Sequence, residues 1–409
     1  MTFRFTPVFL CLAACSAGDG KVALNKPTFD SLPGGVVRVT NTGPTEWADT
    51  SGWRLVEERT ISGDEGTPGE LTDISGIAAD AAGNVYVMQR KPAVIKAYGP
   101  DGAWLRDIGR EGSGPGEFES GMFGIIGDTL FVQDSNNSRL TTFLTSGQFL
   151  SSYRSQCCWW ASRFPIFDDG TVGILGPPPD STARGGVYLT RMNGTVVDTI
   201  LMPKQDDDLA GLWTVTRKFG NNTSMMARNV PLRPSDESAY LRIGGRVTGN
   251  TATYQLAITD LDSDTLRLFS ASAPSVTIDD AQRDSIYEAE IDDAGEQWRD
   301  AFREVAKKAD IPGSWPVWSE VNVDGRGRIW VARPGARGKF SYLDVFSSEG
   351  VLLGSLVAPP KFEFGGRWVG DRLYLQSETE EGLPLVRVFR VDTGPRNTDE
   401  KADRELSAR

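Results

Sequence analysis

The most unusual candidate for reactive chemistry in this chain is the segment Cys157-Cys158-Trp159-Trp160, which places two adjacent thiols beside two indole rings. In an oxidising compartment two cysteines pair. Neighbouring Cα atoms, however, lie about 3.8 Å apart, below the usual disulfide range of about 4.4–6.8 Å. A bond between Cys157 and Cys158 would therefore be a strained ring that stiffens a loop or borders a ligand pocket. Two free thiols packed beside core tryptophans are the alternative, and the spacing differs from the Cys-x-x-Cys of redox catalysts.

Histidine is absent from the 409 residues. Neutral imidazole is the commonest protein metal ligand and the usual base near pH 7. Sites that depend on histidine, including ordinary serine triads, are therefore excluded. Carboxylate chemistry remains, and Asp206-Asp207-Asp208 offers the hard oxygen ligands that calcium takes. Adjacent acidic residues more often form a solvated loop, so we expect no cofactor, with calcium as the alternative.

The formal net charge of −12 limits the partners. Nucleic acid needs a basic face, and anionic lipid headgroups attract basic segments, so neither is an expected partner. With 39% hydrophobic residues, the chain can bury a large core.

The N-terminus has the pattern of an export signal. Arg4 precedes a short apolar run that ends in small residues, which predicts a signal peptide over residues 1–14. Leu12-Ala13-Ala14-Cys15 resembles the bacterial lipobox, which implies acylation of Cys15; an ordinary signal peptide with an incidental cysteine is the alternative. The residue after the cysteine is Ser16 and not Asp, which by analogy with other bacterial lipoproteins favours the outer membrane. Residues 15–50 are rich in Gly, Pro, Thr and Asn without a period, so we predict a flexible tether there.

A repeat runs through the rest of the chain. Val87 and Val132, Tyr98 and Phe143, and Gly102 and Gly147 are each separated by about 45 positions, within the range of propeller blades. The pattern predicts six units of four strands, at about 72–109, 122–154, 162–202, 223–273, 317–357 and 364–393.

The two ends of the repeat region predict ring closure. Trp53–Ile61 has the form of the last strand of a blade but precedes every complete unit, whereas the sixth unit stops after 385–391. We therefore expect the N-terminal strand to complete blade six and remove an open sheet edge. Thr277-Ile-Asp-Asp280 has the form of a capping box, which predicts a helical insertion over 279–309 between blades four and five. The closed domain would cover 51–393, with a disordered tail over 394–409.

Several of these segments resemble the NHL-repeat propellers and the six-bladed propeller lipoproteins of bacteria. The matching segments are Gly114-Pro-Gly-Glu-Phe118, Asp80-x-x-Gly-Asn-Val-Tyr-Val87, Asp134-Ser-Asn-Asn-Ser-Arg139 and Asp-Gly-x-Gly-Arg-Ile-Trp-Val at 324–331. The resemblance implies an all-β six-bladed β-propeller. Propellers of this kind include a lyase, sugar lactonases and interaction scaffolds, so the fold alone does not select a function.

A propeller would gather its d–a and b–c loops on one face. Tryptophan and arginine side chains in these loops are good binding anchors. The ligand-binding residues predicted on this face are Arg90, Asn136, Arg139, Trp159, Trp160, Trp315, Trp318 and Arg333. We expect a non-enzymatic binding or scaffold protein for an envelope protein, peptide or glycan, touching the membrane only through its lipid. The alternatives are a calcium-dependent hydrolase of the lactonase kind, using carboxylates in the channel, and a purely structural envelope module.

Overall fold

The computed structural model describes the chain from Pro27 to Thr393 with gaps. The described residues are 27–41, 53–63, 65–154, 171–176, 183–203, 214–219, 222–227, 233–236, 239–248, 250–260, 264–293, 296, 299–300, 303, 307–311, 313–315, 317–318, 320–334, 340–359 and 366–393.

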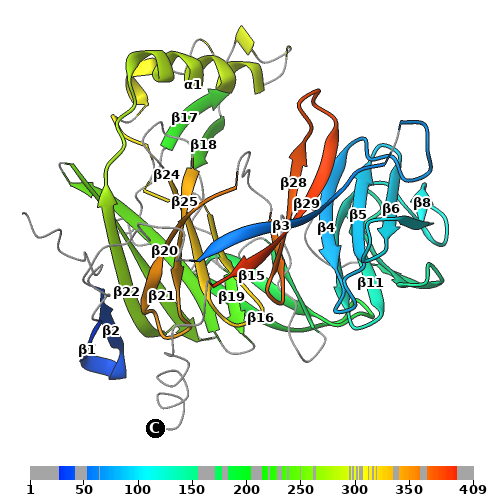
Figure 1. Cartoon of the computed structure of the whole chain (residues 1–409), viewed down its shortest axis with the longest axis horizontal. Coiled ribbons are helices and arrows are strands. Elements are labelled where there is room, and N and C mark those ends of the chain that lie inside the picture. The colour runs from blue at the N-terminus through cyan, green and yellow to red at the C-terminus, as the bar shows by residue number, and fades with distance from the viewer. Residues whose placement is uncertain are drawn as a thin grey trace, which may run out of the picture.

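The chain folds as a six-bladed β-propeller (Figure 1). Each blade is an antiparallel sheet whose strands we name a to d in sheet order. Blade one contains β4 (Ile74–Ala79), β5 (Val85–Arg90), β6 (Ala93–Tyr98) and β7 (Trp104–Ile108). Blade two contains β10 (Gly121–Ile126), β11 (Thr129–Asp134), β12 (Arg139–Leu144) and β13 (Phe149–Arg154). The described part of blade three contains β14 (Val172–Gly176), β15 (Ala183–Thr190) and β16 (Val196–Pro203).

The second half of the chain completes the ring. Blade four contains β19 (Arg233–Asp236), β20 (Ala239–Thr248), β21 (Thr251–Asp260) and β22 (Thr265–Pro274). Blade five contains β23 (Glu320–Val323), β24 (Ile329–Pro334), β25 (Phe340–Phe346) and β26 (Leu352–Val357). Blade six contains β27 (Arg367–Val369), β28 (Arg372–Glu378), β29 (Pro384–Asp392) and the N-terminal β3 (Arg54–Ile61). A hairpin of β17 (Thr214–Phe219) and β18 (Asn222–Ala227) lies outside the blades, so the unit predicted to begin at 223 begins ten residues later.

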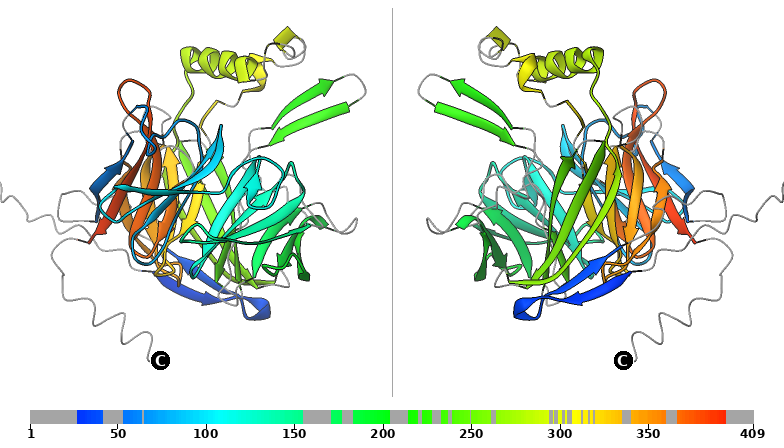
Figure 2. Two further views of the ribbon diagram at one scale, coloured as in Figure 1. Left: turned by 90° about the vertical axis from the view of Figure 1, so that its right-hand side faces the viewer. Right: turned by 90° about the vertical axis from the view of Figure 1, so that its left-hand side faces the viewer.

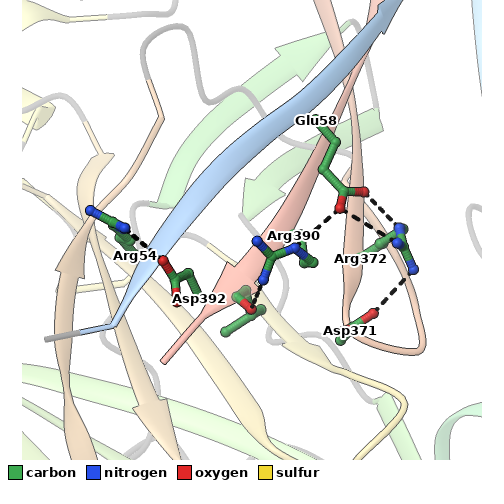
Figure 3. A network of polar contacts seen from close by, with 7 residues as sticks. Arg54, Glu58, Asp371, Arg372, Arg390 and Asp392 are labelled. Carbon is green, nitrogen blue, oxygen red and sulfur yellow. Dashed lines mark hydrogen bonds and ion pairs between the residues drawn. The ribbon is translucent and has the colours of Figure 1, made fainter. Parts of the chain in front are cut away.

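Closure by the N-terminal strand is confirmed. β3 pairs with β29 from Arg54↔Asp392 to Ile61↔Val386. Ion pairs accompany this ladder (Figure 3): Glu58 contacts Arg372 at 2.7 Å and Arg390 at 3.1 Å.

The same strands carry two further ion pairs between the chain ends. Arg54 contacts Asp392 at 2.7 Å (Figure 3), and Arg387 contacts Glu57 at 2.5 Å. The hydrogen bond from Arg387 lowers the pKa of Glu57.

One irregularity recurs in all six blades. The pairing of strands c and d shifts by one residue and leaves a β-bulge on strand d, near its start in blades one to five and in the middle of β3 in blade six. The extra residues are Leu105, Leu150, Val197, Leu266, Leu353 and, in blade six, Glu58. Bulges twist an outer strand and so protect its edge from pairing with other chains.

The core lies between neighbouring blades. Ile61, Val87 and Tyr374 belong to one buried cluster shared by blades six and one, and Tyr254 and Phe346 belong to another shared by blades four and five. The c–d turns contribute to these contacts, because their glycines face strand d of the preceding blade. Gly350, with φ of 79°, packs directly on the Phe269 ring.

The a–b turns of blades one and five have the structure that their sequence predicts. The Asp80 carboxylate accepts hydrogen bonds from the Asn84 backbone N–H at 2.9 Å and from the Tyr86 hydroxyl at 3.1 Å. Asp324 does the same for the Arg328 backbone N–H at 3.0 Å and the Trp330 indole at 2.8 Å. Burial together with the Asp80 charge raises the pKa of Tyr86 to about 12.

The tether predicted over 15–50 is wrong for residues 28–40. β1 (Thr28–Ser31) and β2 (Val37–Thr40) form a hairpin, and β2 pairs in parallel with β22 from Val37↔Arg267 to Thr40↔Ser270. Blade four thereby becomes a six-stranded sheet, with β1 and β2 at its outer edge. Val39 is buried at 1% exposure, so this segment belongs to the domain and not to a linker. The predicted signal peptide and tail lie outside the described residues.

Candidate functional site

The propeller has two different ends. In an antiparallel blade the b–c turns and d–a connections lie at one end, here called the insertion end, and the a–b and c–d turns lie at the other, the turn end. Figures 1 and 2 show α1 (Asp280–Asp293), the β17–β18 hairpin and the β28–β29 turn projecting at the insertion end. The β1–β2 hairpin lies at the turn end. The insertion end therefore carries the larger additions to the blades.

The insertion that contains α1 stands on a short stem. Thr277 and Ser314 form an isolated antiparallel bridge. The Ile278 N–H donates to the Gly313 carbonyl at 3.0 Å, and the Trp315 N–H donates to Val276 at 2.8 Å. The chain thus leaves and re-enters the propeller at neighbouring points.

The cap of α1 lies two residues later than its predicted position at Thr277–Asp280. The Asp279 carboxylate accepts a hydrogen bond from the Gln282 N–H at 2.7 Å, and the Gln282 side chain accepts one from the Asp279 N–H at 3.0 Å. This reciprocal pair is a capping box. It forms at Asp279 because Thr277 is already held in the stem.

A row of acidic side chains on α1 binds the segment that returns to the propeller. Asp284 contacts Lys308 at 2.7 Å, Glu288 contacts Arg303 at 3.6 Å, and Asp292 contacts Arg299 at 3.4 Å. The order of the basic residues is the reverse of that of the acidic ones, so the returning segment runs antiparallel to α1. Exposed pairs of this kind contribute about 0–1 kcal/mol each. The predicted insertion over 279–309 therefore contains α1 and a 3₁₀ turn at Lys308–Asp310 among its described residues.

Arg139 has a structural role at the insertion end. Its guanidinium donates to the carbonyls of Ser113 at 2.7 Å and Glu117 at 2.6 Å, which holds the connection between blades one and two. Glu117 in turn accepts from the Gly114 N–H at 2.7 Å, and this bond lowers its pKa. The guanidinium of Arg139 therefore stabilises the loop between blades one and two.

Arg333 is not a surface residue. It is 3% exposed within β24, and its Nε donates to Asp344 at 2.9 Å. Asp344 also accepts from the Tyr254 hydroxyl at 2.5 Å and from Ser355. Burial and the Asp344 charge raise the pKa of Tyr254, so the phenol stays protonated and donates to the carboxylate. The prediction of Arg333 as a loop-face ligand contact is wrong because strand b continues through Pro334 and is packed on both faces.

The other predicted residues divide between core and surface. Trp318 is 6% exposed in the cluster with Tyr254 and Phe269, so it is a core residue and not an exposed anchor. Trp315 is half-buried beside the stem. Arg90 and Asn136 are exposed at the insertion end; Arg90 pairs with Asp73 at 3.2 Å.

The remaining predicted residues, Cys15, Cys157, Cys158, Trp159 and Trp160, and the acidic run at 206–208 lie outside the described residues. Among the residues that are described, no group of three or more His, Cys, Asp or Glu side chains is arranged to hold a metal ion. No described helix is long and apolar enough to cross a membrane.

Leu383, an exposed apolar residue at the insertion end, was missed from the sequence. Leu383 is 60% exposed in the β28–β29 turn. It directly follows Glu380-Glu381-Gly382, and an isolated leucine in a polar turn was the available signal.

Comparisons with known proteins extend to the fold alone. No protein-family model matches the chain, and no curated protein matches it. Among solved structures, a protein of Bacteroides fragilis that is described as exported is 11% identical, with a TM-score of 0.48 over 85% of this chain and 98% of its own. A DUF4221 family member from Bacteroides vulgatus is 12% identical, with a TM-score of 0.43 over 85% and 100%. Virginiamycin B lyase from Staphylococcus aureus is 10% identical, with a TM-score of 0.40 over 82% and 99%.

Proposed function

We propose that this chain is an exported, lipid-anchored propeller that binds an envelope protein, peptide or glycan through its insertion end. The main observation behind this proposal is the insertion that contains α1 and is attached through the Thr277–Ser314 stem. Closure of the ring does not require this insertion. The β17–β18 hairpin projects at the same end, as does the β28–β29 turn (Figure 2). Loops placed on a rigid scaffold are where binding functions concentrate.

Exposed side chains of suitable type lie at this end. Arg90 is 56% exposed in its side chain, Asn136 is exposed, and Leu383 is 60% exposed. Together they offer a cation, an amide and an apolar contact, a mixture typical of the rim and core of a binding surface. The lipobox at Cys15 and the signal peptide support the anchor and the envelope location, with Ser16 favouring the outer membrane.

The stem allows a clean test of the insertion. Because Ile278 and Gly313 already contact each other, residues 279–312 can be replaced by a short glycine turn without breaking a blade. We expect this variant to unfold cooperatively on heating, which shows that the propeller still folds. It should no longer recover the binding partners that the wild-type chain enriches from envelope extract.

As a control, Leu105→Lys changes an exposed residue at the turn end of blade one, and this variant should recover the same partners as the wild-type chain. Arg90→Ala combined with Leu383→Ser should reduce their recovery several-fold. Equal recovery by the wild-type chain and the insertion-deleted variant would show that the insertion end is not the binding surface.

A further inference from the structure

We infer that the outer turn end of blades four and five faces the lipid bilayer, so that the insertion end is turned away from the membrane. The surface consists of Phe29, Leu266 and Leu353, here called the hairpin patch. The inference rests on the lipid anchor of the proposed function and adds to it the side of the molecule that touches lipid.

The point at which the anchor joins the domain is fixed. β2 pairs with β22, and the side chain of Asn41 joins blades four and five. Its Nδ2 donates to the carbonyls of Ser270 at 3.2 Å and Gly350 at 3.1 Å, and its Oδ1 accepts from the Leu352 N–H at 2.8 Å. Any pull on the chain that precedes Thr28 is therefore transmitted to this side of the ring.

The segment between Cys15 and the described domain is too short to let the propeller take any orientation relative to the membrane. Residues 16–26 separate Cys15 from the described domain. A chain of that length spans about 40 Å fully extended and about 18 Å as a random coil. A compact domain of this size is about 50 Å across. The hairpin side therefore lies within reach of the bilayer, whereas the opposite side of the ring lies a whole domain diameter further away.

Three exposed apolar side chains lie on the strands beside the anchor point, among charged residues such as the Arg267–Glu349 ion pair. Phe29 on β1 is 52% exposed, Leu266 at the bulge of blade four 46%, and Leu353 at the bulge of blade five 37%. The contacts of Asn41 and the β2–β22 ladder join the strands that carry these residues, β22 of blade four and β26 of blade five, to the N-terminal hairpin. Aromatic and aliphatic side chains enter the interfacial layer of a bilayer, and a net charge of −12 opposes adsorption to anionic lipid. The occupant we assign is therefore a neutral phospholipid surface.

The sixfold repeat supplies matched control positions. In a ring of six, blade one lies opposite blade four and blade two opposite blade five. Leu105 and Leu150 occupy the same bulge as Leu266 and Leu353, with exposures of 42% and 44%. They thus place the same side chain at the same bulge on the far side of the molecule, where no described strand such as β2 lies beside strand d.

The experiment places the photo-cross-linker p-benzoylphenylalanine at one position at a time, in the full chain expressed and anchored in bacterial membranes. The positions are Phe29, Leu266 and Leu353 in the patch, Leu105 and Leu150 as bulge controls, and Leu383 at the insertion end. Lipid adducts are counted by mass spectrometry after irradiation. We expect adducts at the patch to exceed those at the bulge controls several-fold, with the fewest at Leu383.

Equal adduct yields at Leu105 and Leu266, or a higher yield at Leu383, would overturn the orientation. The anchor is tested separately by sedimentation of the unsubstituted chain with membranes and its release by Cys15→Ser. A chain that never sediments would refute the anchor in the proposed function, and the orientation with it. A chain that sediments but lacks adducts at all three patch positions would refute the lipid contact alone.

Discussion

Replacing Gly350 by alanine should show how much the propeller depends on its c–d turns. Gly350 has φ of 79°, and a Cβ there would lie 2.7 Å from two ring atoms of Phe269 on the preceding blade. The left-handed conformation costs a non-glycine residue about 1–2 kcal/mol, and forcing a methyl group into a packed contact costs about 1–3 kcal/mol. We therefore expect Gly350→Ala to lower the free energy of unfolding by about 2–5 kcal/mol.

Gly382 provides the matched control. Its φ is 85°, and a Cβ there would meet nothing within 4 Å. Gly382→Ala should therefore lose only the conformational part, about 1–2 kcal/mol. Urea unfolding followed by tryptophan fluorescence measures both variants, with the slope of the transition unchanged. Equal losses would show that the Phe269 contact adds nothing and that blades are held by strand pairing and core area alone.

Three further outcomes concern charged groups. Glu58→Gln removes the partner of Arg372 and Arg390 and should cost about 1–2 kcal/mol as part of a network, measured by urea unfolding and reduced by high salt. Because the pKa of Glu57 is lowered below its ordinary 4.5, its ion pair stabilises the fold above that pH and is lost as pH falls through the folded-state value. The stability difference between wild type and Glu57→Gln should therefore shrink below about pH 4.5. Arg333→Met leaves the buried Asp344 without its cation and should cost about 3–5 kcal/mol; no loss would show that Tyr254 and Ser355 suffice.

The repeat and the closure were accessible from sequence because they depend on local signals. Val87 and Val132 occupy the same position of strand b, opposite polar residues of strand c. Gly102 and Gly147 both form c–d turns with positive φ. These positions recur because every blade needs the same turn chemistry at the same spacing.

The hairpin at the N-terminus was missed because its partner is remote in sequence. Val37–Thr40 is a short alternating segment between glycine and proline, and only its pairing with residues of β22 makes it a strand. Arg333 was misplaced for a related reason. An arginine beside a proline has the pattern of a loop, and its burial follows from Asp344 on the next strand, which no local pattern reveals.

The charged residues of blade six explain why that blade alone lacks an apolar bulge residue. In blades one, two, three and five a glycine-containing turn joins strands c and d and sets their register. Blade six has no such turn, because β29 and β3 come from opposite ends of the chain and their ion-paired residues are separated by as many as 338 positions. A one-residue slip of β3 would turn each side chain to the other face. Such a slip would separate the ion-paired charges, which makes it unfavourable. Glu58 at the bulge therefore helps to set the register of strands c and d in blade six, as the glycine-containing turn does in blades one, two, three and five.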